Sequence, residues 1–238
     1  MTQKTAIVTG ANRGLGFEIS RQLAQAGYHV ILCARDLASG GDALKTLQAE
    51  NLSVELRRVD VSNTEQTQSL ADYLRENNVK IDVLINNAGI LPETSKSIGA
   101  KSADPLLVSP VTVMEILNVN TLGPLRLIQA VAPHMPAGSR IVNIASWMGQ
   151  FKRLEGRHLG YRMSKTALNA ITGIMAKRLE EDDIQVHSVC PGWVRTSMGG
   201  KNADLPVEEA AANVVWVATS EEVTDSGKFW RNRKQIEW

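Results

Sequence analysis

Short apolar runs recur at regular intervals along the chain, and longer amphipathic segments separate them. Each run is almost continuously apolar, which predicts strands buried on both faces, as in a parallel sheet covered by helices. The five clearest runs are Ala6–Val8, Val30–Ala34, Val83–Ile85, Ile141–Ile144 and Val186–Cys190. Leu52–Val59 is a sixth strand candidate with weaker alternation.

The separating segments have the length and the apolar spacing of helices. They are Phe17–Ala26, Asp42–Glu50, Glu65–Asn77, Thr112–His134, Tyr161–Glu181 and Val207–Ser220. Alternating strands and helices predict an α/β fold, a single doubly wound (Rossmann-type) parallel sheet with helices on both faces. A final edge strand with a basic end is expected within Lys228–Lys234.

No repeat, low-complexity tract or linker divides the chain, so we expect one domain over residues 1–238. The one long irregular stretch is 91–110, which is polar and rich in Ser and Lys. Because it exceeds the usual connections of such folds, it is either a mobile flap or a family-specific insertion.

Composition narrows the classes of partner. The chain has 26 Lys and Arg against 25 Asp and Glu, a formal net charge of +1, which argues against an extended nucleic-acid surface. Two cysteines exclude a disulfide framework and a four-cysteine zinc site, and the four histidines lack the spacing of metal ligands. No stretch approaches the roughly 18 apolar residues of a membrane span. We therefore expect a soluble, cytoplasmic protein without a metal, nucleic-acid or membrane partner.

A glycine-rich turn, Thr9-Gly-Ala-Asn-Arg-Gly-Leu-Gly16, follows the first predicted strand. Glycines at such a junction permit a tight turn and let backbone amides approach a pyrophosphate at the next helix N-terminus. The spacing differs from the common G-x-G-x-x-G pattern, and turns of many kinds are rich in glycine. Its position predicts a dinucleotide site built from Gly10, Asn12, Arg13, Gly14, Leu15 and Gly16.

The end of the second strand distinguishes between the two nicotinamide cofactors. An acidic residue there would bind a ribose 2′-hydroxyl, whereas an arginine accommodates a 2′-phosphate. Here Ala34 occupies the acidic position and Arg35 follows it, while Arg13 lies within the glycine turn. The pair favours NADP(H), with Asp36 turned away from the phosphate. The alternative is that both arginines are merely solvated.

Tyr161 and Lys165 are four residues apart, so on a helix they share one face. A phenol has a pKa near 10, and a neighbouring ammonium is expected to lower it into a useful range for acid–base chemistry. An isolated pair of this spacing is common on exposed helices. Ser146 favours a functional role for the pair, because this serine lies at the carboxyl end of a buried strand, where ligands of open α/β sheets bind.

The motifs together resemble the short-chain dehydrogenase/reductase family, specifically its carbonyl-reductase branch. They occur in the family's order over residues 5 to about 197: Thr9–Gly16, Asp60-Val61, Asn86-Asn-Ala-Gly89, Asn120-Thr-Leu-Gly123, Ser146, Tyr161-Arg-Met-Ser-Lys165 and Pro191-Gly192. The gap between Ser146 and Tyr161 is slightly long, which indicates a loop expansion at Trp147–Leu159. The large insertion of monomeric vertebrate carbonyl reductases is absent.

The resemblance implies four catalytic residues. Tyr161 acts as the general acid/base, Ser146 holds the substrate oxygen, and Lys165 holds the nicotinamide ribose. Asn120 holds a water that connects the lysine to solvent; capping or kinking its helix is the alternative role. The resemblance also implies further cofactor contacts at Asp60 and Val61, at Asn87, Ala88 and Gly89, and at Pro191, Gly192, Val194 and Thr196.

The implied activity is NADP(H)-dependent reduction of an aldehyde or ketone, or oxidation of the matching alcohol. Loops at about 91–110 and 193–206 would shape the substrate site, and Trp147, Met148, Trp193 and Met198 would line it unless they are core residues. One alternative is a 3-oxoacyl-carrier reductase. Such an enzyme is expected to have a basic docking patch near the site, and the presence of Lys152, Arg153 and Arg157 leaves this alternative open. Another is a non-catalytic NADP(H)-sensing protein. The helices 112–134 and 161–181 would form a homodimer or homotetramer.

Overall fold

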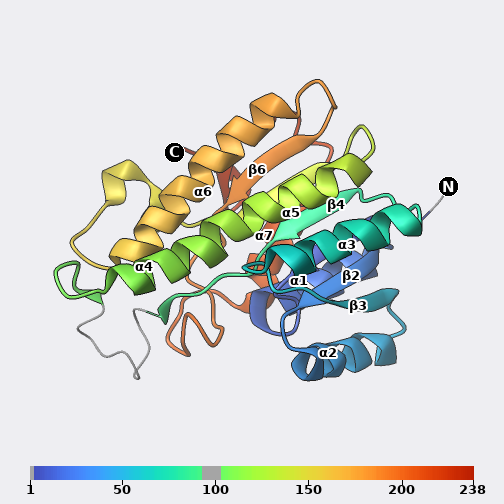
Figure 1. Ribbon diagram of the computed structural model, residues 1–238, viewed down its shortest axis with the longest axis horizontal. Helices are drawn as coiled ribbons and strands as arrows, with labels where there is room; N and C mark the ends of the chain where they lie inside the picture. The colour runs from blue at the N-terminus through green and yellow to red at the C-terminus, as the bar shows by residue number, and fades with distance from the viewer. Residues whose placement is uncertain (1–2, 93–102) are drawn as a thin grey trace.

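A computed structural model describes residues 3–92 and 103–238, which form one eight-stranded sheet (Figure 1). Its order is β3-β2-β1-β4-β5-β6-β7-β8, and every neighbouring pair is parallel except β7 and β8. The strands are β1 (Thr5–Thr9), β2 (His29–Ala34), β3 (Val54–Arg58), β4 (Val83–Asn86), β5 (Arg140–Ile144), β6 (Gln185–Val189), β7 (Phe229–Arg231) and β8 (Lys234–Ile236). The chain order reverses direction across the sheet between β1 and β4, which confirms the doubly wound α/β fold.

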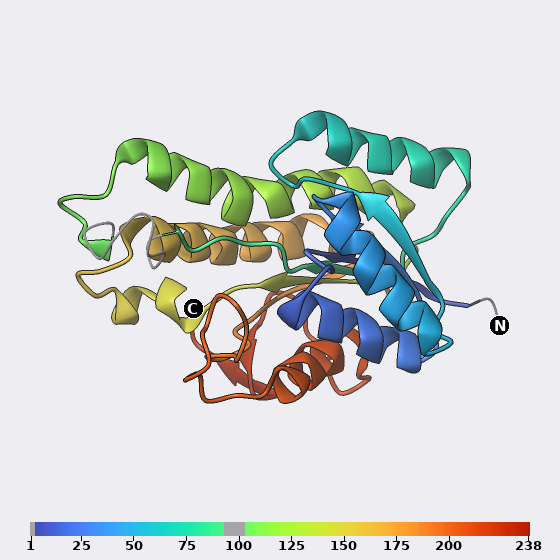
Figure 2. The same ribbon diagram turned by 90° about the horizontal axis from the view of Figure 1, so that it is seen from below.

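Helices cover both faces of the sheet (Figure 2). The helices α1 (Gly14–Gln25), α2 (Leu37–Ala49) and α7 (Val207–Thr219) pack on one face. The other face carries α3 (Thr64–Glu76), α5 (Gly123–Val131) and α6 (Leu159–Arg178), and α4 (Pro110–Leu117) packs against α6. Within the described residues, no helix combines the length and the apolar character needed to span a membrane.

Two of the predicted helices differ from the structure. The helix predicted to start at Asp42 starts at Leu37, because the Asp36 side chain accepts a hydrogen bond of 2.8 Å from the Ser39 amide and caps it. The helix predicted over 112–134 is interrupted: a π-helical turn, Asn118–Leu122, separates α4 from α5, and a 3-10 turn follows at Ala132–His134. π-Helical turns of this kind often occur at functional sites.

The predicted edge strand near the C-terminus is two strands. β7 and β8 pair antiparallel through a two-residue turn, Asn232-Arg233, in which both residues have positive φ of 49° and 59°. Such a pair of left-handed residues is typical of the tight turns that match strand twist. The expected single strand over 228–234 is therefore wrong, and β8 is the edge.

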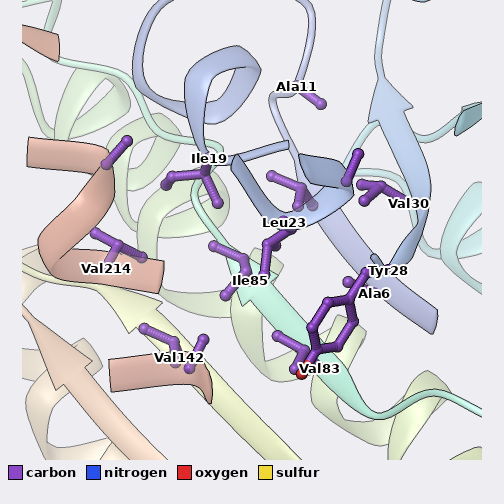
Figure 3. Packing of buried hydrophobic residues seen from close by; sticks show 14 of the residues in the cluster. Ala6, Ala11, Ile19, Leu23, Tyr28, Val30, Val83, Ile85, Val142 and Val214 are labelled. Atoms are coloured by element: carbon purple, nitrogen blue, oxygen red, sulfur yellow. The ribbon is translucent and has the colours of Figure 1, made fainter. Parts of the chain in front are cut away.

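A hydrophobic cluster under α1 and α7 holds α1 against the sheet (Figure 3). Leu23 of α1 and Val214 of α7 meet Ile85 of β4 and Val142 of β5, and all four side chains are fully buried. Burying a leucine or valine contributes about 1.5–3 kcal/mol, so this cluster holds the helix that follows the glycine turn in place.

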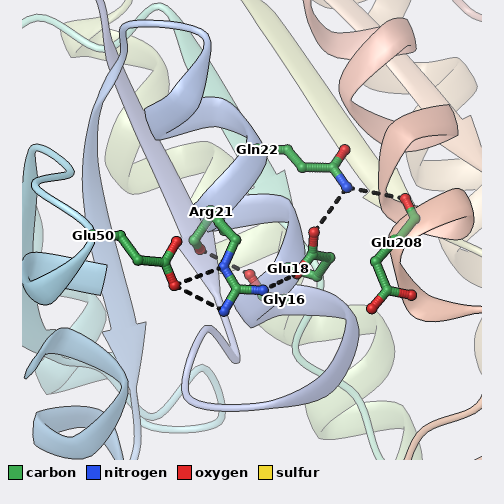
Figure 4. Close-up of polar contacts among 7 residues, drawn as sticks. Gly16, Glu18, Arg21, Gln22, Glu50 and Glu208 are labelled. Carbon is green, nitrogen blue, oxygen red and sulfur yellow. Dashed lines mark hydrogen bonds and ion pairs between the residues drawn. The ribbon is translucent and has the colours of Figure 1, made fainter. Parts of the chain in front are cut away.

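Polar contacts attach the outer face of α1 to its neighbours (Figure 4). Arg21 lies between Glu18, at 2.6 Å, and Glu50 at the end of α2, at 3.1 Å. Gln22 donates to Glu18 at 2.9 Å and to the Glu208 carbonyl in α7 at 3.0 Å. Together with the apolar cluster, these contacts fix the orientation of the glycine turn at the helix N-terminus.

Candidate active site

The glycine turn closes tightly against the end of β4. Gly10 and Gly14 have φ of 62° and 56°, in the left-handed region that favours glycine. A Cβ on Gly16 would overlap the Asn87 side-chain nitrogen and the Gly10 carbonyl oxygen. Asn87 Nδ2 itself donates to the Thr9 carbonyl at 2.8 Å, and Thr9 Oγ1 accepts from the backbone amides of Asn87 and Ala88, each at 3.0 Å. The Asn87 amide group thus holds the turn in shape.

The segment after β6 approaches the same turn. A Cβ on Gly14 would lie 3.4 Å from Thr196 Cγ2, so the glycine turn and Thr196 face each other. The loop 193–206 is held by its own contacts: Val194 pairs with Leu205 as a β-bridge, and Trp193 Nε1 donates to the Gly199 carbonyl at 2.8 Å. The segments that follow β1 and β6 therefore border one site at the carboxyl edge of the sheet.

The two arginines predicted to select NADP(H) are exposed beside the start of α2. Asn12 Nδ2 donates to Ser39 Oγ at 3.0 Å, which connects the glycine turn to the first turn of α2. Asp36 turns into that helix as its cap. Its hydrogen bonds with Ser39 hold the pKa of its carboxyl below the usual range, and the positive charge of Arg35 adds to this effect. Within residues 3–92 and 103–238, neither Arg13 nor Arg35 forms an ion pair. Both guanidinium groups remain available to an anion.

Ser146, Tyr161 and Lys165 meet at the carboxyl end of β5. Ser146 lies just beyond the strand, where its Oγ accepts from the Met148 amide at 3.2 Å. Tyr161 lies in the first turn of α6, and Lys165 follows one turn later. Lys165 Nζ donates to the Ile144 carbonyl at 2.6 Å and lies 5.6 Å from the centre of the Tyr161 ring. The structure therefore brings together the three side chains that the sequence singled out.

The expected lowering of the Tyr161 pKa is wrong in this structure. Burial raises the pKa of Tyr161 to about 12; the nearby Cys190 adds to the rise, and a hydrogen bond with Ser146 opposes it. Burial also lowers the pKa of Lys165 to about 8, so the ammonium form that was expected to stabilise the phenolate is itself disfavoured. At neutral pH the phenol carries its proton.

Cys190 is a member of this group that the sequence prediction missed. Its Sγ accepts a hydrogen bond of 3.3 Å from the Trp147 amide, and the side chain is buried. The signal was its position: Cys190 follows β6 directly, and the parallel neighbour β5 ends next to Ser146. Carboxyl ends of neighbouring parallel strands lie at the same edge of the sheet.

Asn120 lies inside the π-helical turn and is almost completely buried. Its Oδ1 accepts from the Ile90 amide at 2.8 Å, while its Nδ2 donates to the Ile90 carbonyl at 2.9 Å and to Ser164 Oγ at 3.1 Å. Ser164 in turn donates to the Tyr161 carbonyl at 2.8 Å. Asn120 thus connects the segment after β4 with the first turn of α6, and Ser164 is a second contributor that the sequence prediction missed.

The other predicted cofactor residues line the same edge. Asp60 accepts from the Ser62 amide at 2.9 Å and from its hydroxyl at 2.6 Å, and Val61 packs against Gly123, whose added Cβ would lie 2.8 Å away. Gly89 borders Asn120, since its added Cβ would lie 3.3 Å from Oδ1. Leu15 is half-buried in the glycine turn, while Pro191 and Gly192 (φ 88°) lead from β6 into the loop 193–206.

On the substrate side, the structure differs from the apolar wall expected at Trp147. Its ring lies 4.5 Å from the guanidinium carbons of both Arg153 and Arg231. Trp193 and Met198 are about half-exposed in the loop after β6. Of the predicted loop 91–110, residues 93–102 lie outside the described residues, so its role as a flap or insertion stays a prediction.

Comparison with known proteins identifies relatives over the whole chain. The (+)-neomenthol dehydrogenase of Arabidopsis thaliana is 32% identical, with 99% of this chain and 98% of the relative covered. Carbonyl reductase [NADPH] 1 of Sus scrofa is 30% identical, with 99% and 94% covered. The alignment with the first spans 292 positions, more than the 238 residues of this chain, so that relative has segments lacking here.

Solved structures agree with the sequence relatives. The NADPH-bound carbonyl reductase from chicken fatty liver superimposes with a TM-score of 0.86 at 26% identity over the full length of both chains. Carbonyl reductase Sniffer of D. melanogaster does so with a TM-score of 0.85 at 27% identity, again over both full lengths. The short chain dehydrogenase family model matches residues 4–205. This chain belongs to the short-chain dehydrogenase/reductase family and resembles its carbonyl-reductase branch.

Proposed function

We propose that the protein is an NADP(H)-dependent oxidoreductase that reduces an aldehyde or ketone, or oxidises the matching alcohol. The observation that carries the proposal is the grouping of Ser146, Tyr161 and Lys165 at the carboxyl end of β5, beside the glycine turn. Two relatives support it by name, one as a carbonyl reductase that uses NADPH and one as a dehydrogenase of a cyclic alcohol.

The chain fits a dinucleotide with a 2′-phosphate. Positive φ at Gly10 and Gly14 shapes a tight turn at the N-terminus of α1, where backbone amides can approach a pyrophosphate. Arg13 and Arg35, which form no ion pair among the described residues, lie by the first turn of α2. The residues proposed to hold the cofactor are Gly10, Asn12, Arg13, Gly14, Leu15, Gly16, Arg35, Asp60, Val61, Asn87, Ala88, Gly89, Tyr161, Lys165, Pro191, Gly192, Val194 and Thr196. When bound, the cofactor supplies or accepts the hydride.

The chain's own residues manage the proton and the developing charge. The Ser146 hydroxyl donates to the substrate oxygen and stabilises negative charge as it forms. The Tyr161 hydroxyl gives its proton to that oxygen; because burial raises its pKa to about 12, it carries this proton at neutral pH. Lys165 is fixed beside Tyr161 by the Ile144 carbonyl, and Asn120 fixes the first turn of α6 through Ser164.

Tyr161→Phe tests the proposal, because it removes only the hydroxyl. We expect the turnover of NADPH with aldehydes to fall by about 100-fold or more, while NADPH binding is kept. Tyr73→Phe is the matched control: Tyr73 contacts Glu55 far along the sheet from Ser146, and the variant is expected to keep full turnover. Near-full activity of Tyr161→Phe would contradict the mechanism.

A broad substrate panel separates this function from the alternatives. One basic group of the suggested carrier-docking patch is already engaged, because Lys152 pairs with Glu237. We therefore expect free aldehydes and ketones to be reduced at least as well as carrier-bound 3-oxoacyl groups. Binding of NADPH without its consumption on any carbonyl would instead indicate a sensing protein.

We also propose that the chain forms a homodimer or homotetramer. Large apolar side chains are exposed on the helices predicted to form the interface: Val111 and Met114 on α4, and Met163 and Ile174 on α6. Such a concentration of exposed apolar side chains is typical of an association surface. A monomer in light scattering would contradict this proposal. The cytoplasmic location stays a prediction from the sequence.

A further inference from the structure

A small cleft opens at the carboxyl end of β7, next to Ser146. Its volume is about 240 Å³, and its lining includes Trp147, which directly follows Ser146, and Arg231, the last residue of β7. Cys190 donates its amide to the Trp230 carbonyl at 2.8 Å, so the end of β7 lies beside Cys190, which in turn lies near Tyr161 and Lys165. The cleft therefore adjoins the proposed reaction centre.

The cleft has an excess of positive charge. Arg153 and Arg231 each have their guanidinium carbon 4.5 Å from the centre of the Trp147 ring, and Lys152 also lines the cleft. The one carboxylate in the lining, Glu237, pairs with Lys152, and its side chain is 77% exposed. The charges of Lys152 and Glu237 offset each other, which leaves the positive charges of Arg153 and Arg231 in excess.

Most of the guanidinium donors are unused. Arg153 donates through Nε to Gln150 at 3.0 Å, and within the described part of the chain neither its other nitrogens nor any of Arg231 has a hydrogen-bond acceptor. Two guanidinium groups on one aromatic ring repel each other, and an anion bound next to both would offset this repulsion. A planar guanidinium fork matches the two oxygens of a carboxylate or phosphate.

We propose that this cleft is a subsite for an oxyanion substituent, a carboxylate or a phosphate, on the carbonyl substrate. The proposal rests on the proposed function and names the substrate class: acidic aldehydes or ketones. The volume supports a substituent rather than a whole substrate, because ligand pockets usually measure about 300–1,000 Å³. The oxyanion contacts Arg231 and Arg153 while the carbonyl group reaches Ser146 and Tyr161.

Matched substrates test the subsite. Initial rates are measured with para-carboxybenzaldehyde, with its neutral methyl ester, and with para-formylphenyl phosphate, which distinguishes the two oxyanions. We expect kcat/KM to be higher for at least one acid than for the ester, and to fall with ionic strength for that acid only. Arg231→Met is expected to lower kcat/KM for that acid about ten-fold and to leave the ester unchanged, whereas Arg231→Lys keeps part of the preference.

Arg233→Met is the matched control. Arg233 lies two residues away in the β7–β8 turn and lines the groove between α1 and α7 instead of the cleft. It makes the same change in net charge, so an equal effect of Arg233→Met on the acid would overturn the subsite in favour of a general surface potential. Equal loss of acid and ester in Arg231→Met would also overturn it.

The test separates the subsite from the reaction. Reduction of the ester without any preference for an acid would refute the subsite and leave the proposed function standing. If no aldehyde is reduced, the proposed function fails; calorimetric titration with para-carboxybenzaldehyde then decides the subsite by itself. Binding that is lost in Arg231→Met but kept in Arg233→Met supports it, and equal binding by all three proteins refutes it.

Discussion

The Asn120 side chain pairs with the backbone of Ile90 in both directions. Oδ1 accepts from the Ile90 amide at 2.8 Å, and Nδ2 donates to the Ile90 carbonyl at 2.9 Å. These two hydrogen bonds connect the π-helical turn to the segment that follows β4. The side-chain amide of Asn120 pairs with Ile90 as a backbone peptide group of a neighbouring strand would. Asparagine within a helix is unfavourable unless its amide is satisfied, and here every polar atom of the side chain has a partner.

Asn120→Ala is expected to lower the free energy of unfolding by about 2 kcal/mol, because two backbone groups of Ile90 lose their partner. Urea denaturation measures this change. Asn202→Ala is the control, since Asn202 is exposed, and its effect should stay within about 0.5 kcal/mol. Equal stability of the two variants would show that the Ile90 contacts contribute little. Turnover of Asn120→Ala should also fall, because the link to α6 through Ser164 is lost.

Lys165 makes stability depend on pH. Its pKa is lowered to about 8 in the folded protein from an ordinary value of 10.5, so between these pH values the unfolded chain binds one more proton. Stability therefore rises with pH across this window. The difference corresponds to a gain on the order of 3 kcal/mol. Tyr161 acts in the opposite sense between about pH 10 and 12, because its folded pKa is the higher one.

Lys165→Met isolates this contribution. At pH 7 the buried ammonium is costly in the wild type, so the variant should gain stability relative to it; the gain should disappear as the pH approaches 10. Urea unfolding of both proteins at pH 7 and pH 9.5 measures the change, and the other ionisable groups cancel in the difference. A stability difference that does not vary with pH would show that Lys165 is not destabilised by burial.

Arg13 and Arg35 are expected to determine the preference for NADPH over NADH. Replacing either with Ala should lower kcat/KM for NADPH about ten-fold, equivalent to one charge-assisted hydrogen bond to the 2′-phosphate. The value for NADH, which has no such phosphate, should stay unchanged and serves as an internal control. Parallel losses with both cofactors would place the two arginines outside the 2′-phosphate site.

Local spacing and strand ends made much of the site predictable. Tyr161 and Lys165 meet because residues four apart share a helix face, and Ser146 joins them because the strand before it is an unmistakable apolar run. The start of α2 was missed because Gly40 and Gly41 interrupt its amphipathic pattern. A single side chain, Asp36, decides where that helix begins.

The remaining misses concern contacts between distant segments. Arg231 lies 84 positions after Trp147, and only the sheet order places it against that ring. The direction of the Tyr161 pKa depends on the extent of burial, which spacing does not reveal: the nearby ammonium suggested a fall, whereas desolvation raises it. Such features follow from packing among several elements.

Alanine substitutions at two glycines test whether steric crowding in the glycine turn requires a glycine at residue 16. Gly16→Ala places a Cβ against Asn87 Nδ2 and the backbone oxygen of Gly10, neither of which can move without opening the turn. We expect a loss of about 1–3 kcal/mol in unfolding free energy and a rise in the KM for NADPH. Gly41→Ala in α2 is the control, because its Cβ would enter open space. That variant should gain about 0.5–1 kcal/mol, since alanine favours a helix interior more than glycine does. Thermal unfolding with and without NADPH compares the two: if Gly16→Ala matched Gly41→Ala in stability and in NADPH binding, the turn would not require a glycine at residue 16.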